Sequence, residues 1–165
     1  MTLPDDFVRY THDMMGDRLY SAFEKALSEE PSVSIRLNRF KVQTMPKAGV
    51  AVPWCPSGMY MDERPAFTFD PLLHAGAYYV QEASSMFVDR VLHQYVTEPV
   101  RMLDMCAAPG GKSTAARAAL PEGSLLMANE PMRQRANILM ENIAKQGHPD
   151  VIVTNNYPKD YRKSG

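Results

Sequence analysis

The feature that most constrains the fold is an alternation of strand and helix patterns from residue 100 onward. Three short apolar runs, VRMLDM, SLLMANE and DVIVTN, are bounded by turn residues, as buried strands are. Between them lie the alanine-rich KSTAARAAL and the segment PMRQRANILMENIAKQGH, which opens with proline, carries an apolar stripe and closes with glycine. This order predicts a doubly wound parallel α/β sheet with right-handed crossovers. Helical spacing in YYVQEASSMFVDRVLHQY predicts a preceding helix over residues 78–95.

The first 72 residues follow a different pattern. Apolar residues recur at helical spacing between Gly16 and Glu30 and stop at Pro31, which predicts an amphipathic helix. Residues 32–43, SVSIRLNRFKVQ, alternate as a half-buried strand or two would, and prolines and glycines divide residues 50–72 into loops and short strands. We therefore expect a small α+β domain at residues 1–72 and the start of a second domain at residues 73–165.

Composition excludes several classes of protein. The 165 residues are 45% hydrophobic, which suffices for a core, and the net charge of −1 means that any contact with nucleic acid must come from a local patch. Two cysteines outside any C-x-x-C pair, and an N-terminus without a signal pattern, predict a reduced, cytoplasmic protein with no membrane span. The scattered histidines lack metal-ligand spacing, so we expect no metal.

The turn LDMCAAPGGKST looks like a phosphate-binding loop but does not meet its pattern. A P-loop needs a glycine six residues before its lysine, and Cys106 holds that place relative to Lys112. A dinucleotide fingerprint fails as well, because Gly110 and Gly111 are adjacent. A P-loop hydrolase is therefore disfavoured. The glycines would still let a ligand approach the backbone, and the next helix presents its positive end.

An acid at the end of the next predicted strand completes a candidate nucleoside site. Ligands of such sheets sit beyond the carboxyl ends of the strands, and Glu130 lies there. A carboxylate at that place can accept both hydroxyls of a ribose; the alternative is a solvated loop acid. A ribose-binding acid without a pyrophosphate loop favours S-adenosylmethionine over NAD.

Several motifs resemble one known family. LDMCAAPGGKST, YYVQEASSM and MANE closely resemble segments of the Sun/Fmu (NSUN, RsmF-like) RNA cytosine-C5 methyltransferases, and SIRLNRFK and VPWCPSGMY look like N-terminal segments of its bacterial ribosomal-RNA members. The resemblance implies an S-adenosylmethionine-dependent RNA methyltransferase, with rRNA as the expected substrate. It also implies a Rossmann-like class I methyltransferase sheet, of which residues 73–165 hold the first half. The cofactor-binding residues that it implies are Cys106, Ala107, Ala108, Pro109, Gly110, Gly111, Lys112, Glu130 and Asn156.

The implied adenine contact departs from the family pattern. Where the family tends to have an acid after the third strand, this chain has Asn156 and Tyr157. Asn156 can offer a carbonyl acceptor to an adenine amino group, and Asp160 is an alternative acid at a longer offset.

The resemblance also implies a thiol nucleophile. Cytosine C5 becomes reactive after a thiolate adds to C6, and the family carries that thiol on a Pro-Cys motif after the fourth strand. We expect it beyond Gly165, so that this chain is the N-terminal portion of a longer enzyme and is inactive alone. Cys106 is interpreted as a small residue under the cofactor, and Cys55 as a packed apolar residue.

A basic stretch is the candidate RNA contact, with a solvated strand face as the equal alternative. It consists of Arg36, Arg39, Lys41 and Lys47. Trp54 and Tyr60 are interpreted as buried aromatics rather than base-stacking residues. A sheet of three strands leaves an open edge, so we expect self-association. The alternative function is a non-catalytic RNA-binding or assembly module on the same scaffold.

Overall fold

The computed structural model describes residues 3–44 and 49–163, and the chain divides into two compact units, residues 1–32 and 33–165. The first unit is the helix α1 (Asp5–Ser28), which is interrupted at Gly16 by a φ of 70° and a ψ of 166°. Its C-terminal part is the predicted amphipathic helix. The turns before Gly16 add a helical segment that the periodicity did not predict. The ring of His12 contacts that of Tyr20 edge-on across this bend, with centroids 4.9 Å apart.

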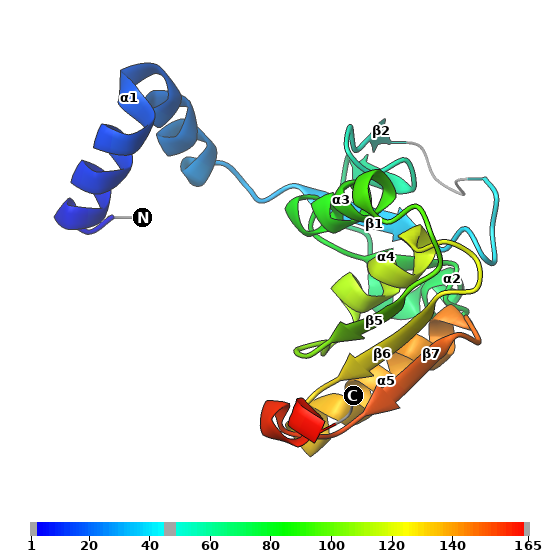
Figure 1. Ribbon diagram of the computed structural model, residues 1–165. Coiled ribbons are helices and arrows are strands. Elements are labelled where there is room, and N and C mark those ends of the chain that lie inside the picture. The colour runs from blue at the N-terminus through cyan, green and yellow to red at the C-terminus, as the bar shows by residue number, and fades with distance from the viewer. Residues whose placement is uncertain (1–2, 45–48, 164–165) are drawn as a thin grey trace. The chain divides into compact units, whose positions relative to one another are not determined.

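The second unit begins with an antiparallel sheet in the order β2-β3-β1-β4; β1 and β2 of this sheet are labelled in Figure 1. Its strands are β1 (Val33–Leu37), β2 (Val50–Ala51), β3 (Gly58–Met61) and β4 (Tyr78–Val80). Ile35, Leu37 and Tyr78 are buried together in its core. The strand predicted over residues 32–43 ends at Leu37, because the carbonyl of Asn38 accepts the N–H groups of residues 41 and 42 and so closes a turn.

The helix predicted over residues 78–95 is wrong at its start. Tyr78, Tyr79 and Val80 form β4 and pair with β1, and a 3-10 turn (Ser84–Met86) leads into the helix α3 (Phe87–Tyr95). Aromatic and β-branched residues suit a strand, and the edge of β1 supplies the partner. The domain boundary near residue 72 stays a prediction; β4 follows it and belongs to the antiparallel sheet.

A parallel sheet in the order β5-β6-β7 follows, as the sequence pattern predicts. Its elements are β5 (Arg101–Asp104), α4 (Gly111–Ala119), β6 (Leu125–Asn129), α5 (Arg133–Gln146) and β7 (Val151–Thr154). Ala128 in β6 packs against Leu139 and Ile143 of α5, whereas Leu92 of α3 packs against α4. The expected fold class is confirmed: a small antiparallel α+β part precedes a Rossmann-like parallel sheet.

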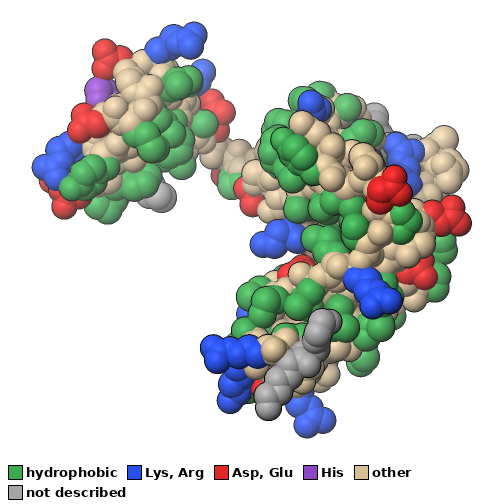
Figure 2. Space-filling model, in the orientation of Figure 1, with side chains coloured by type: hydrophobic (Ala, Val, Ile, Leu, Met, Phe, Trp, Pro, Cys, Tyr) green, Lys and Arg blue, Asp and Glu red, His purple; other side chains and the backbone are tan. Residues whose placement is uncertain are grey.

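The remaining elements are short. They are the 3-10 segments Phe67–Phe69 and Pro158–Lys163 and the one-turn helix α2 (Pro71–His74). Apolar side chains are visible at the surface of the second unit (Figure 2), and Leu103, Ile138 and Ile152 are large exposed examples. Over residues 3–44 and 49–163, no helix has the length and apolar character needed to cross a membrane.

Candidate cofactor-binding site

The loop after β5 is fixed by the last residue of that strand. One carboxylate oxygen of Asp104 accepts the N–H of Cys106 at 3.1 Å, and the other accepts the hydroxyl of Ser113, in the first turn of α4, at 2.7 Å. The N–H of Ala107 donates to the carbonyl of Asn129 in β6 at 2.8 Å. Asp104 therefore ties the start of the loop to the start of α4, a role that the sequence motifs did not reveal.

Side chains of α5 hold the middle of the same loop. Arg135 donates to the carbonyl of Ala108 at 3.0 Å, and Asn142 donates to the carbonyl of Pro109 at 2.8 Å. Since both carbonyls accept hydrogen bonds from α5, this helix fixes the backbone of the loop.

The two glycines at the start of α4 allow close packing. Gly110 has a φ of 114°, in the left-handed region, and a Cβ there would lie 3.3 Å from Leu139 in α5. A Cβ on Gly111 would lie 3.4 Å from the ring of Tyr79, which is an ordinary contact. The bare α-carbons thus face α5 and β4. The first N–H groups of a helix lack intrahelical partners, so the start of α4 can bind a negatively charged group.

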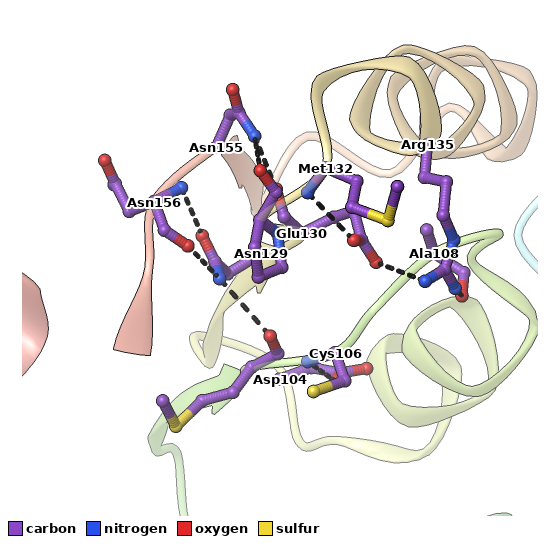
Figure 3. A network of polar contacts seen from close by, with 11 residues as sticks. Asp104, Cys106, Ala108, Asn129, Glu130, Met132, Arg135, Asn155 and Asn156 are labelled. Carbon is purple, nitrogen blue, oxygen red and sulfur yellow. Dashed lines mark hydrogen bonds and ion pairs between the residues drawn. The ribbon is translucent and has the colours of Figure 1, made fainter. Parts of the chain in front are cut away.

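Glu130 follows β6, and its carboxylate points toward Arg135 (Figure 3); the residue is only 2% exposed. One oxygen accepts the N–H of Met132 at 3.0 Å, and the other lies 3.5 Å from the guanidinium of Arg135. Arg135, whose second nitrogen reaches Ala108, therefore links the predicted ribose-binding acid to the predicted cofactor loop. The sequence could have indicated this role, because Arg135 lies five residues after Glu130 in the first turn of α5.

Asn129 joins the ends of all three parallel strands and is fully buried (Figure 3). Its amide nitrogen donates to the carbonyls of Met105 and Asn156, at 3.2 and 3.0 Å. Its oxygen accepts the hydroxyls of Thr154 and Tyr161 and the N–H of Asn156, at 3.1, 3.0 and 3.0 Å. This amide was not among the predicted site residues, although it precedes Glu130 directly.

The predicted adenine contact lies at the end of β7. The side chain of Asn156 is exposed and donates to the hydroxyl of Tyr161 at 3.4 Å. The alternative acid, Asp160, accepts the N–H of Tyr157 at 2.9 Å and so caps the 3-10 segment. An adenine contact by Asn156 stays a prediction.

The remaining loop residues and aromatics differ in exposure. Cys106 and Lys112 are exposed at the loop. Cys55 is fully buried in an apolar cluster, as interpreted from the sequence. Trp54 is partly buried and donates to the carbonyl of Ala83 at 2.7 Å; Tyr60 is partly buried as well.

The basic stretch does not form one exposed face. Arg36 is 1% exposed, with its guanidinium bonded inside the protein, so its assignment as an RNA contact is wrong. Arg39 and Lys41 are exposed, although Lys41 also donates to the carbonyls of Ala75 and Lys145, at 2.8 and 2.7 Å. The fourth predicted contact, Lys47, lies outside the described residues.

Two family models together match nearly the whole chain. Residues 3–83 match the N-terminal domain of 16S rRNA methyltransferase RsmF, and residues 86–164 match 16S rRNA methyltransferase RsmB/F. The chain belongs to the RsmB/F family. The resemblance drawn from the motifs is thereby confirmed, and the family is one of S-adenosylmethionine-dependent rRNA methyltransferases.

Individual relatives of this RsmB/F chain support the same family assignment. Ribosomal RNA small subunit methyltransferase F of Enterobacter sp. is 29% identical over 92% of this chain and 34% of its own length. The protein of that name from Vibrio atlanticus is 31% identical over 93% of this chain and 35% of its own length. The chain thus spans about a third of the length of these curated relatives. The crystal structure of NSun6 from Pyrococcus horikoshii with SFG is 16% identical over 93% of this chain and 65% of its own, with a TM-score of 0.74, which supports the fold.

Proposed function

We propose that this chain is the cofactor-binding part of an S-adenosylmethionine-dependent rRNA cytosine-C5 methyltransferase. The observation that carries the proposal is that one side chain, Arg135, joins the carboxylate of Glu130 to the carbonyl of Ala108 in the loop that precedes α4. Relatives named as small-subunit rRNA methyltransferases support the RNA substrate, and a protein of similar fold was crystallised with SFG.

The residues present fit the proposed cofactor. The unpaired N–H groups at the start of α4 suit its carboxylate tail. Among the described residues each oxygen of Glu130 has one polar partner, so lone pairs remain for the two ribose hydroxyls. Asn156 would supply the acceptor for the adenine amino group. When bound, S-adenosylmethionine supplies an electrophilic methyl group on its sulfonium.

The protein's own residues position this group rather than react with it. Asp104, Arg135 and Asn142 fix the loop, and Asn129 holds the ends of the strands in register. The nucleophilic thiol for cytosine C6 is proposed to lie in a part of the enzyme outside these residues, so this chain would bind the cofactor without transferring methyl groups. We place the protein in the cytoplasm and assign RNA contact to Arg39 and Lys41, the exposed members of the basic stretch.

Calorimetric titration with S-adenosylmethionine tests the proposal. Glu130→Gln removes a charged acceptor; because a hydrogen bond to a charged group contributes about 1.5–3 kcal/mol, the affinity should fall about 10- to 100-fold. Glu141→Gln changes an exposed acid of α5 and is the matched control, expected to bind like the parent. Thermal melting confirms that both variants fold. A parent chain that binds RNA and gives no heat with the cofactor would instead support the non-catalytic RNA-binding module.

A further inference from the structure

Arg36 is a buried cation held by neutral groups. Its Nε donates to the side-chain oxygen of Gln81 at 2.8 Å, and its Nη2 donates to the hydroxyl of Thr114 at 2.6 Å. Within the described ranges 3–44 and 49–163, no carboxylate forms an ion pair with it. Burial lowers the pKa of Arg36, and the nearby carboxylate of Asp89 opposes this effect only in part. A buried charge that makes no direct ion pair is costly, so its hydrogen bonds to the interior need to be complete.

The hydrogen bond to Thr114 continues into the glycine turn. The hydroxyl of Thr114 accepts from Arg36, so its single proton is free to donate, and the carbonyl of Gly110 lies 2.8 Å away. The same guanidinium nitrogen lies 3.5 Å from the carbonyl of Gly111. Arg36 in the antiparallel sheet therefore contacts the carbonyl of Gly111 directly and reaches that of Gly110 through Thr114.

The partner Gln81 is itself fixed. Its backbone carbonyl accepts the hydroxyl of Ser34 at 2.6 Å, and its N–H donates to the carbonyl of the same residue at 3.2 Å. Its side-chain oxygen faces Arg36, and the buried Nε2 has no hydrogen-bond partner in the part of the chain that the structure describes. Ser34 in β1 thus fixes the backbone of Gln81, and the side chain of Gln81 orients the guanidinium of Arg36.

We propose that Arg36 is a positioning residue for cofactor binding: through Thr114 it holds Gly110 in the left-handed conformation from which the N–H groups of α4 point at the ligand. This inference rests on the proposed function. It replaces the expected RNA contact with an intramolecular role, and it makes the antiparallel sheet part of the cofactor site although no residue of that sheet need touch the cofactor.

The test compares S-adenosylmethionine affinity by calorimetry among Arg36→Lys, Thr114→Val and the double variant. A lysine ammonium cannot bond Gln81 and Thr114 with the geometry of the planar guanidinium. Each single variant should lose about tenfold in affinity, and the double variant should lose no more than the worse single one, because all three break one chain of bonds. Should Arg36→Lys fail to fold, Thr114→Val, which is nearly isosteric, carries the comparison.

Asn38→Ala is the control for a purely structural role. Asn38 lies in the same segment and donates to the carbonyls of Gly76 and Gln146, at 2.9 and 2.8 Å, away from the glycine turn. This variant should be less stable yet bind the cofactor within about twofold of the parent. If it loses affinity as much as Arg36→Lys, or if Arg36→Lys and Thr114→Val bind like the parent, the proposal is overturned.

Amide hydrogen exchange of the chain without cofactor separates this inference from the proposed function. The N–H of Thr114 donates to the carbonyl of Gly110 at 2.8 Å, and in Arg36→Lys it should exchange about tenfold faster, with β6 amides unchanged. A parent chain that fails to bind S-adenosylmethionine would refute the proposed function, whereas unchanged exchange at Thr114 would refute the role of Arg36.

Discussion

Replacing Asn129 by alanine removes the side chain on which the ends of the three parallel strands converge. The amide makes five hydrogen bonds, to Met105, Thr154, Tyr161 and the backbone N–H and carbonyl of Asn156. The residue is fully buried, so water does not reach these groups without local opening.

The structure sets the magnitude of the loss. The hydroxyls of Thr154 and Tyr161 lie 2.6 Å apart, so in the variant one of them can donate its freed proton to the other. The variant loses three hydrogen bonds to the backbone without replacement: those to the carbonyl of Met105, the carbonyl of Asn156 and the N–H of Asn156. At about 1 kcal/mol net for each, Asn129→Ala should lower the free energy of unfolding by about 3 kcal/mol.

Urea unfolding, followed by the fluorescence of Trp54, the single tryptophan, measures this loss. The matched control is Asn156→Ala, whose exposed side chain makes one long bond of 3.4 Å and should cost less than about 0.5 kcal/mol. A loss below about 1 kcal/mol in Asn129→Ala, or an equal loss in both variants, would refute the reasoning.

Three further predictions concern the turn, a histidine and the sheet edge. Gly110→Ala should lower the melting temperature, because a side chain at a φ of 114° costs about 1–2 kcal/mol, whereas Gly111→Ala should not; equal effects would contradict this. Burial and the charge of Arg117 lower the pKa of His148, while Asp150 opposes them. The unfolded chain therefore binds a proton at a higher pH than the folded chain does, so the free energy of unfolding falls as the pH drops below about 6.5. His148→Gln should make stability less dependent on pH in this range, and an unchanged slope would show that His148 does not cause the dependence. Light scattering should show self-association that Leu103→Lys, at the exposed edge strand β5, weakens; a monomeric parent would contradict it.

The parallel sheet was predictable because its signals are local. Each strand is a short apolar run bounded by turn residues, and each helix has its own period and ends. β5, β6 and β7 and the helices α4 and α5 lie where these patterns put them. The strand formed by Tyr78 to Val80 was missed because its state depends on pairing with β1, which lies about forty residues upstream and which local periodicity does not register.

The role of Arg36 was not predictable for a related reason. Alternation in β1 puts Ile35 and Leu37 on one face and Ser34 and Arg36 on the other. A polar face normally points to water, yet both faces of β1 are buried. The polar face meets Gln81 and α4, where its groups find hydrogen-bond partners that no pattern in the sequence announces.

For the candidate site, the sequence supplied the residues predicted to face the ligand, which stay a prediction, and it missed the residues that hold them in place. Glu130 and the glycine turn were predicted because motif and strand position mark them. The sequence did not predict the supporting residues Asp104, Asn129 and Arg135. Their partners are mostly backbone carbonyls and N–H groups, which come close to them only in the folded chain.

The central claim is that the start of α4 receives the methyl donor. Nuclear magnetic resonance of the labelled chain during titration with S-adenosylmethionine tests it most directly, because four glycines report on different places. The amides of Gly110 and Gly111 should shift on saturation, while those of Gly123 and Gly147, in turns after α4 and α5, should stay in place. Shifts confined to Gly123 or Gly147, or no shift at Gly110 and Gly111 with saturating ligand, would contradict the account.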